Sequence, residues 1–404
     1  MLKNNSTFLF FIGFCAVVSL GANNCPAQNS FVEFQKTLSE KALFTATDFS
    51  ALAQNQPVVK LLSPRDKREV VVAGIVPLQV PAGLFLQSFR ENLTRKSNPA
   101  ILEIGSFSSS PTIGDLQLLT FEDRDLEDLR QCVVGDCRLK LSATMIDRLH
   151  REVDWTASDY RVQATRVLKL MLLDYVRDYS ARGDAALIEY HDKQTEVSLA
   201  DEQRDLLAAL GREVIPDIPQ YLNSFPGPEL AMVEQVLVWS KIKFGFKPVI
   251  AINHITIYRR EQESGPQILI ASKQIYANHY FDSSLSLTAF IRVPGTNPGS
   301  YLFYENRSRA DGIGGVFSNL KHSMVENRAL EGVKAILLQS QLSLEARALN
   351  RSESSESAAD VDSPRRWKVG RLQAFLLLLC IGALVVLVGL RSYSWRVGVS
   401  GAMR

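Results

Sequence analysis

Residues Leu285–Val293 read LSLTAFIRV, and the period-two pattern of this stretch is the strongest indication of the fold. Apolar side chains occupy its odd positions, while Ser286, Thr288 and Arg292 lie between them. Such alternation is typical of an antiparallel strand that buries one face and leaves the other wetter. We therefore expect one side of this strand to pack against the hydrophobic core.

The sequence on both sides of this strand predicts a sheet and a covering helix. Further strands are expected at Lys247–Arg260, Gln267–Asn278 and Ser300–Arg307. The intervening turns are short and contain glycine, proline or aspartate, so the four strands should form an antiparallel meander. After the glycine-rich stretch Asp311–Gly315, a long helix is expected to about Ala348, with Val333 and Leu337 available to pack on the sheet.

The upstream sequence predicts a smaller β-rich opening and then a helical region. A hairpin is expected within 57–76, a helix from Pro81 and a strand at Ile101–Phe107. From about 112 to 245 the apolar period becomes helical, most clearly at Ser158–Ser180, and a short helix is expected at Glu229–Lys243. The fold class expected is α+β, with a β-meander, a large helical insertion and a long final helix.

This order of elements resembles the START-like, or helix-grip, superfamily. The stretch EVVVAGIVPLQVPAGLFLQSF is similar to the strand-to-helix opening of that superfamily, and the resemblance covers about residues 57–107 and 246–349. It implies a long helix that grips a curved sheet, with a cavity between them for a lipid or another apolar ligand. The segments IASKQIYANHYFD and YLFYENRSRADGIGG also resemble uncharacterised exported bacterial single-pass membrane proteins.

The N-terminal sequence predicts export. Lys3 precedes an uncharged apolar run from Phe8 to Val18, and small residues follow at Gly21 and Ala22. This is the three-part pattern of a secretory signal, so residues 1–22 are expected to be a signal peptide, with an uncleaved anchor as the alternative.

The C-terminal sequence predicts a membrane anchor. Leu372–Leu390 is a continuous apolar run that matches the bilayer core in length, and Trp367 and Trp395 bracket it. Residues 350–371 are polar and are expected to form a stalk. The expected product is a single-pass protein of the cell membrane. Its body, residues 23–349, would be periplasmic or on the cell surface, and its tail, residues 391–404, would be cytoplasmic.

Composition limits the partners and the cross-links. The formal net charge is +2, which gives no reason to expect nucleic-acid binding. Cys132 and Cys137 flank the turn dipeptide Gly135-Asp136, so an exported domain is expected to join them in a disulfide. We expect no metal site there, because nearby residues supply no further ligands at suitable spacing.

No catalytic motif is present, so an enzyme is the less favoured class and no cofactor is expected. The zincin, Walker and Gly-x-Ser-x-Gly patterns are all missing. The candidate ligand contacts are Tyr276, His279 and Tyr280, together with an anion-binding set at the start of the last helix, Arg307, Arg309 and Asp311. Each also has a structural interpretation, a hydrogen-bonded histidine or a capping ion pair.

Three functions are compatible with this sequence. The first is binding of a lipid or other apolar molecule, and the second is interaction or scaffolding within an envelope complex. The third is a hydrolase that uses His279.

Overall fold

The computed structural model describes residues 36, 38–39, 44–96, 99–210, 217–227, 232–262, 265–293, 299–310 and 318–357. The helices are α2 (Ala46–Ala53), α3 (Ala82–Asn92), α4 (Asp123–Asp128), α5 (Ala143–Glu152), α6 (Tyr160–Arg182), α7 (Leu199–Ala209), α8 (Asp217–Ser224) and α9 (Ser318–Ser357). The strands are β1 (Val58–Leu62), β2 (Glu69–Pro77), β3 (Ile101–Ser106), β4 (Glu189–Tyr190), β5 (Val197–Ser198), β6 (Val233–Ile242), β7 (Val249–Gln262), β8 (Gly265–Ala277), β9 (Phe281–Arg292) and β10 (Ser300–Ala310).

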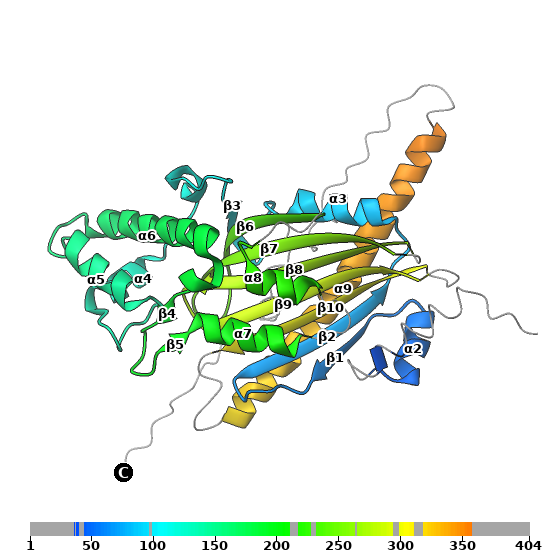
Figure 1. The fold of residues 1–404 in the computed structure, drawn as a ribbon, viewed down its shortest axis with the longest axis horizontal. Coiled ribbons are helices and arrows are strands. Elements are labelled where there is room, and N and C mark those ends of the chain that lie inside the picture. The colour runs from blue at the N-terminus through cyan, green and yellow to red at the C-terminus, as the bar shows by residue number, and fades with distance from the viewer. Residues whose placement is uncertain are drawn as a thin grey trace, which may run out of the picture.

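Eight strands form one antiparallel sheet in the order β1-β2-β10-β9-β8-β7-β6-β3, and β4 and β5 form a separate hairpin (Figure 1). Strands β6 to β10 are neighbours in both sequence and sheet, so the expected meander and the α+β class are confirmed. The opening strands β2 and β3 pair with opposite ends of this meander. The assignment to the START-like superfamily stays a prediction.

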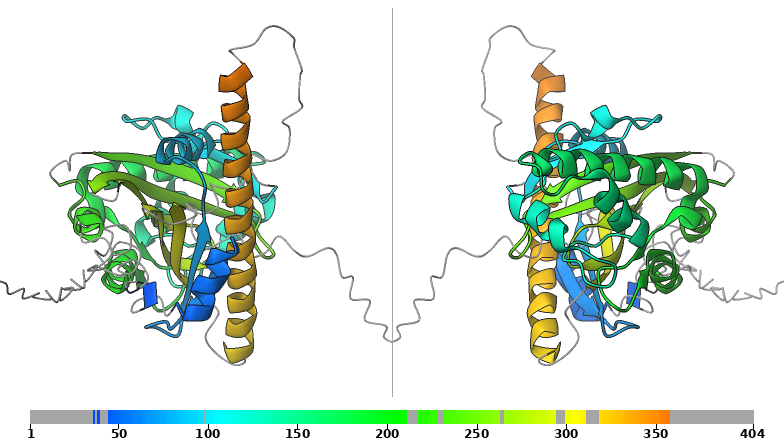
Figure 2. Two further views of the ribbon diagram at one scale, coloured as in Figure 1. Left: turned by 90° about the vertical axis from the view of Figure 1, so that its right-hand side faces the viewer. Right: turned by 90° about the vertical axis from the view of Figure 1, so that its left-hand side faces the viewer.

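Both faces of the sheet are covered. Helices α6, α7 and α8 lie over one face, and α9 runs along the other, as the two side views show (Figure 2). We call these the insertion face, which includes Leu269 and Leu287, and the α9 face, which includes Ile270 and Phe290. Ser286 and Thr288 are buried on the α9 face. The expectation of a wetter face in this strand is therefore wrong, because α3 and α9 cover the polar side as well.

The long helix α9 contacts the sheet directly over β2. A side-chain carbon built on Gly74 would lie 2.5 Å from Leu337 Cδ1 and 3.3 Å from Val333 Cγ1, so this glycine permits the close approach. Both predicted packing residues, Val333 and Leu337, are buried there. The interface between α9 and β2 is thus filled by side chains at this point.

The prediction of a helix at Glu229–Lys243 is wrong, because residues 233–242 form strand β6. Val238, Trp239 and Ile242 are buried, and β6 pairs with both β7 and β3. Charged residues within the run mimic a helical period. The β-branched and aromatic side chains instead fill both faces of a central strand.

The predicted terminal segments lie outside the described residues, namely the signal at 1–22, the span at 372–390 and the tail at 391–404. In the part of the chain that the structure describes, no helix combines the length and apolarity that a bilayer crossing requires. Helix α9 continues to Ser357, so residues 350–357, the first part of the expected stalk, are helical.

Candidate functional site

The residues predicted as ligand contacts lie in separate surroundings, and Asp311 lies outside the described residues. Tyr276 is buried on the insertion face, with its ring centroid 6.5 Å from that of Tyr175 and 6.4 Å from that of Tyr190. Burial raises the pKa of the Tyr276 phenol well above its ordinary value. Its surroundings are therefore those of a core aromatic residue.

His279 belongs to a buried link between the β8–β9 turn and α4. Its Nε2 lies 2.9 Å from Asp125 Oδ2, and Lys247 Nζ donates to the other Asp125 oxygen at 2.6 Å. Burial alone would raise the pKa of Asp125, but hydrogen bonds and charge from His279 and Lys247 outweigh it and lower that pKa. Tyr280, in the same turn with φ +62°, accepts a hydrogen bond from the Lys247 backbone N–H at 3.1 Å.

An acid and an imidazole are thus paired, as a hydrolase would require. However, the hydrogen bonds recorded for His279 among the described residues include no serine, threonine or cysteine hydroxyl or thiol. Within the described residues, the geometry therefore supplies an acid and a base, but no nucleophile bonded to the imidazole.

Arg307 and Arg309 face the helical insertion and are paired with carboxylates. Arg307 donates to Glu69 at 2.9 Å and to Glu305 at 2.7 Å, and Arg309 donates to Glu202 at 2.6 Å. An anionic headgroup would have to displace these partners. Their use as an anion site stays a prediction.

Arg309 adjoins a larger ionic network that we define by Lys140, Asp282, Arg68 and Glu202. Lys140 Nζ lies 2.8 Å from Asp282, and Arg68 bonds Asp282 at 3.3 Å and Glu202 at 2.9 Å. Lys140 and Asp282 are buried. Because these residues come from the loop before α5, from the turn before β2, from β9 and from α7, the network joins the helical insertion to the sheet.

A second buried group surrounds His254 on the insertion face. Tyr179 Oη lies 2.8 Å from His254 Nδ1, and Gln235 Oε1 lies 3.2 Å from Nε2. Burial, aided by the charge of Lys273, lowers the pKa of His254 to about 3. Lys273 is itself buried and paired with Asp184, and burial lowers its pKa despite that partner. The imidazole is therefore held neutral.

The α9 face carries polar side chains of a different kind, which we call the unpaired polar cluster. Ser240, Asn253, Ser272 and Gln274 are 0%, 1%, 2% and 1% exposed. Ser240 Oγ, Asn253 Nδ2, Ser272 Oγ and both amide atoms of Gln274 have no hydrogen-bond partner within the described chain.

Strand register brings these four residues together. Asn253 on β7 lies opposite Gln274 on β8 and opposite Val238 on β6, two residues from Ser240. Ser272 is two residues from Gln274 on the same face of β8. Directly opposed side chains have Cβ atoms about 5 Å apart, so the group occupies one patch across three neighbouring strands.

The next two strands show what a satisfied arrangement looks like. On the same face, Ser284 and Ser308 lie 2.9 Å apart through their hydroxyls, Asn306 donates to Ser284 at 3.3 Å, and Ser308 donates to Asn306 at 2.8 Å. Ser284, Asn306 and Ser308 of β9 and β10 thus bond one another, whereas the four side chains of the unpaired polar cluster do not.

The energetic cost of the unpaired polar cluster is large. A buried polar group without a partner costs about 1–3 kcal/mol. Four such side chains would then cost on the order of 10 kcal/mol, comparable with the roughly 5–15 kcal/mol net stability of a folded domain. Single unpaired atoms also occur elsewhere, for example Trp155 Nε1 and, on β7 itself, Thr256 Oγ1. The cluster is therefore a candidate site for a bonding partner that the described chain does not itself supply.

Sequence patterns did not identify this cluster, although a signal was present. Asn253 interrupts the apolar series Ile255 and Ile257 in β7, and Ser272 interrupts the corresponding series in β8. Uncharged polar residues at core positions of central strands are this signal. Only the register of three strands shows that they meet.

One group of side chains has ligand spacing for a cation. Glu189, His191 and Glu196, from the β4–β5 hairpin, place their ligand atoms within 4.8 Å of one another. Both glutamates are exposed and the histidine is half-buried. Exposed acidic groups gather in this way without a metal, and no other feature here indicates a ligand.

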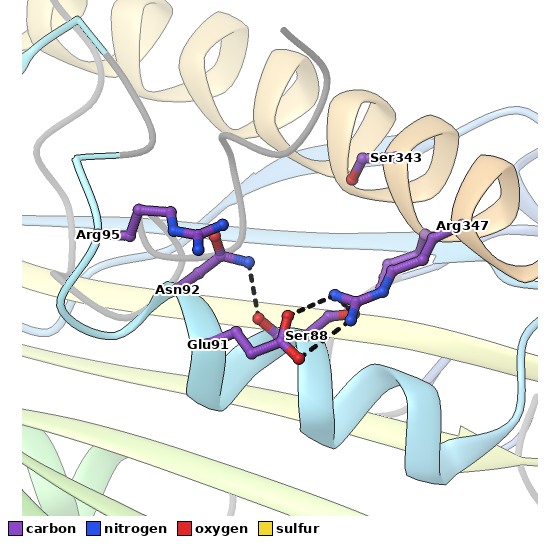
Figure 3. Close-up of a pocket in the computed structure, with 7 residues that line it drawn as sticks. Ser88, Glu91, Asn92, Arg95, Ser343 and Arg347 are labelled. Carbon is purple, nitrogen blue, oxygen red and sulfur yellow. Dashed lines mark hydrogen bonds and ion pairs between the residues drawn. The ribbon is translucent and has the colours of Figure 1, made fainter. Parts of the chain in front are cut away.

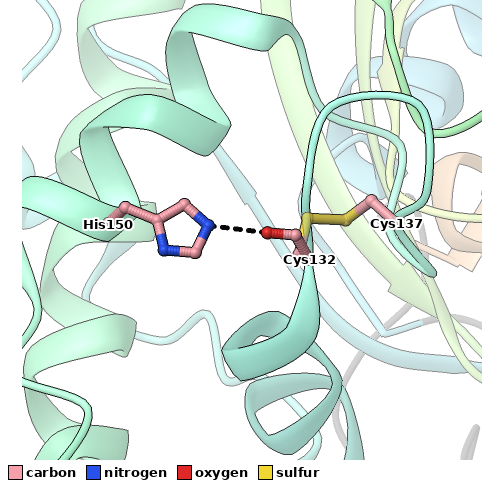
Figure 4. Close-up of a disulfide and its surroundings, with 3 residues drawn as sticks. All are labelled: Cys132, Cys137 and His150. Atoms are coloured by element: carbon pink, nitrogen blue, oxygen red, sulfur yellow. Dashed lines mark hydrogen bonds between the residues drawn. A yellow bond between two sulfur atoms is a disulfide. The ribbon is translucent and has the colours of Figure 1, made fainter.

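The expected disulfide joins Cys132 and Cys137 (Figure 4). Gly135, with φ +86°, makes the turn between them. His150 of α5 bonds the Cys132 carbonyl oxygen at 2.6 Å. The disulfide and the bond from His150 therefore both hold this loop in place, which is a structural role.

A polar surface pocket lies between α3 and α9 (Figure 3). Arg347 of α9 reaches Glu91 of α3 with two hydrogen bonds of 2.8 and 3.0 Å and also bonds Ser88 at 3.0 Å. Arg347 and Glu91 are thus paired with each other, and this ion pair fastens the two helices.

The chain has no match among known protein families, curated proteins or solved structures.

Proposed function

We propose that this protein is a membrane-tethered extracytoplasmic domain that binds a small molecule against the α9 face of its sheet. The single observation that carries the proposal is the unpaired polar cluster, which is buried and lacks partners within the described chain. A bound molecule would supply those partners.

The two faces of the sheet differ in a way that favours this location. On the insertion face, the charged groups Arg307, Arg309 and Lys140 are matched by carboxylates. On the α9 face, the uncharged cluster is flanked by apolar residues such as Ile255 and Ile270. A ligand there would meet hydrogen-bonding groups beside an apolar surface, which agrees with the apolar or lipid ligand expected from the sequence.

The proposed tether rests on the sequence alone. The apolar run Leu372–Leu390 supplies the anchor and residues 1–22 the export signal. Protease added outside intact cells should digest the body and leave a small membrane-bound fragment. A body that stays protected would contradict the extracytoplasmic location.

Native mass spectrometry of the full-length protein, released from detergent micelles, tests the binding function. We expect a population heavier than the polypeptide by the mass of one small molecule. The matched control is Ser308→Ala, which changes the satisfied polar group on the same face. If wild-type protein carries no added mass, and its crystal structure shows only water at the cluster, the binding function is wrong.

A second candidate function is interaction within an envelope complex, and the exposed apolar side chains of the insertion are its candidate contacts. They are Ile113, Leu118, Val133, Val134 and Val162. Exposed apolar side chains on a water-soluble surface are candidates for a partner contact when they are contiguous. In-cell crosslinking of wild type and Leu118→Glu tests this function, since only a contact made there would disappear in the variant.

A further inference from the structure

We propose that the unpaired polar cluster recognises an uncharged chemical group that presents a hydrogen-bond donor beside an acceptor, as in a carboxamide, a lactam or a vicinal diol. This inference rests on the proposed binding function and specifies the chemistry of the bound molecule. It follows from which atoms of the cluster lack partners and from the absence of charge among them.

Gln274 sets the pattern of donors and acceptors. Its Nε2 donates and its Oε1 accepts, both atoms are buried, and neither has a partner within the described residues. A group that offers an acceptor and a donor side by side can satisfy both atoms at once, as two amides do when they pair head to tail.

The neighbouring side chains extend this pattern. Asn253, directly across from Gln274, leaves only its donor Nδ2 unpaired. Ser240 and Ser272 each add a hydroxyl that can donate or accept. The cluster therefore offers more than two bonds and suits a group with several polar atoms.

Charge excludes acids and amines as the preferred ligand group. The four side chains of the cluster are amides and hydroxyls, and all are at most 2% exposed. A carboxylate or an ammonium buried against them would lose its hydration without gaining an opposite charge. Recognition of an anion would instead need the arginines of the insertion face, which already have carboxylate partners.

The test compares two probes of the same shape that differ in charge. Hexanamide and hexanoate, each at the same millimolar concentration, are added to the full-length protein in a nonionic detergent, and thermal unfolding and calorimetric binding are measured. Gln274→Met removes both unpaired amide atoms while keeping the length of the side chain. Ser272→Ala is the second, milder variant, and Ser308→Ala is the matched control on β10.

We expect hexanamide to bind and raise the Tm of wild type, whereas hexanoate does neither. Loss of two hydrogen bonds should weaken hexanamide binding about tenfold in Gln274→Met, with a smaller loss in Ser272→Ala and none in Ser308→Ala. If Gln274→Met fails to fold, Ser272→Ala alone decides the outcome.

Two results would overturn the inference, and they are distinguishable. Tighter binding of hexanoate than of hexanamide would refute the uncharged class and leave a binding function in place. Suppose that neither probe binds and that Gln274→Met has a higher Tm than wild type in the absence of any probe. Removing the polar atoms then stabilises the protein, so the cluster holds no ligand. That second result would refute the proposed function as well.

Discussion

Acidification should destabilise the domain through His254. The imidazole is fully buried beside Tyr179, Gln235 and the charged Lys273, and its pKa is lowered from 6.5 to about 3. The unfolded chain takes up a proton as the pH falls below about 6.5, whereas the folded protein does so only near pH 3. Stability is therefore lost as the pH falls through this window, and the loss levels off below the folded pKa.

The magnitude follows from the difference between the two pKa values. One pKa unit corresponds to about 1.4 kcal/mol, so the whole shift is worth about 5 kcal/mol. Between about pH 7 and pH 5, the contribution of His254 falls by about 2 kcal/mol. This is a large fraction of the net stability of a typical domain.

The assay is urea unfolding of the full-length protein in detergent, followed by tryptophan fluorescence at several pH values. The comparison variant is His254→Gln, because glutamine cannot titrate and keeps an amide near the position of Nε2. Between about pH 7 and pH 5, the free energy of unfolding of wild type should fall by about 2 kcal/mol more than that of His254→Gln. Parallel pH dependence in the two proteins would show that His254 is not held neutral, and the reasoning would be refuted.

Three further changes test the packing described above. Lys140→Met leaves the buried Asp282 with a weaker set of partners and should lower the free energy of unfolding by about 3 kcal/mol in urea titration. Gly74→Ala forces a carbon against α9 and should cost about 1–3 kcal/mol in the same assay. Cys132→Ser opens a short loop and should cost about 2 kcal/mol, measured as a lower Tm that reducing agent does not lower further.

Each change has its own control. Arg204→Met disrupts only the exposed pair with Asp201 and should cost less than about 1 kcal/mol, so an equal loss would contradict the importance of burial. Gly83→Ala meets no atom within 4 Å and should be harmless, and Leu337→Ala should partly rescue Gly74→Ala. If reducing agent lowers the Tm of Cys132→Ser as much as that of wild type, loss of the disulfide is not the cause of the lower Tm.

The sheet could be predicted from sequence wherever a strand keeps its period. Leu285–Val293 predicted β9 because apolar and polar residues alternate, although burial of the polar side could not be foreseen without knowing that α9 covers it. Strand β6 was missed because Glu234 and Lys241 mimic a helical pattern. Its pairing with β7 and β3 overrides that local signal.

The candidate site could not be predicted in the same way. The sequence indicated His279 and Arg309 as candidates because they are titratable or charged. The structure gives each of them a partner, Asp125 and Glu202 respectively. The residues without partners, such as Gln274, carry no charge and belong to no motif. Their significance depends on the register of β6 to β8, which a single sequence does not fix.

The placement of β2 and β3 on either side of the meander affects the order in which the chain can fold. Pro77 pairs with Tyr301, and Gly105 pairs with Trp239, so both opening strands wait for partners that are synthesised much later. Long-range pairing of this kind makes folding slow. A chain that emerges from an export channel N-terminus first would leave β3 unpaired until β6 had crossed, and one edge of β2 unpaired until β10 had crossed. A chaperone that shields strand edges, or rapid passage through the channel, would therefore favour a high yield of folded protein.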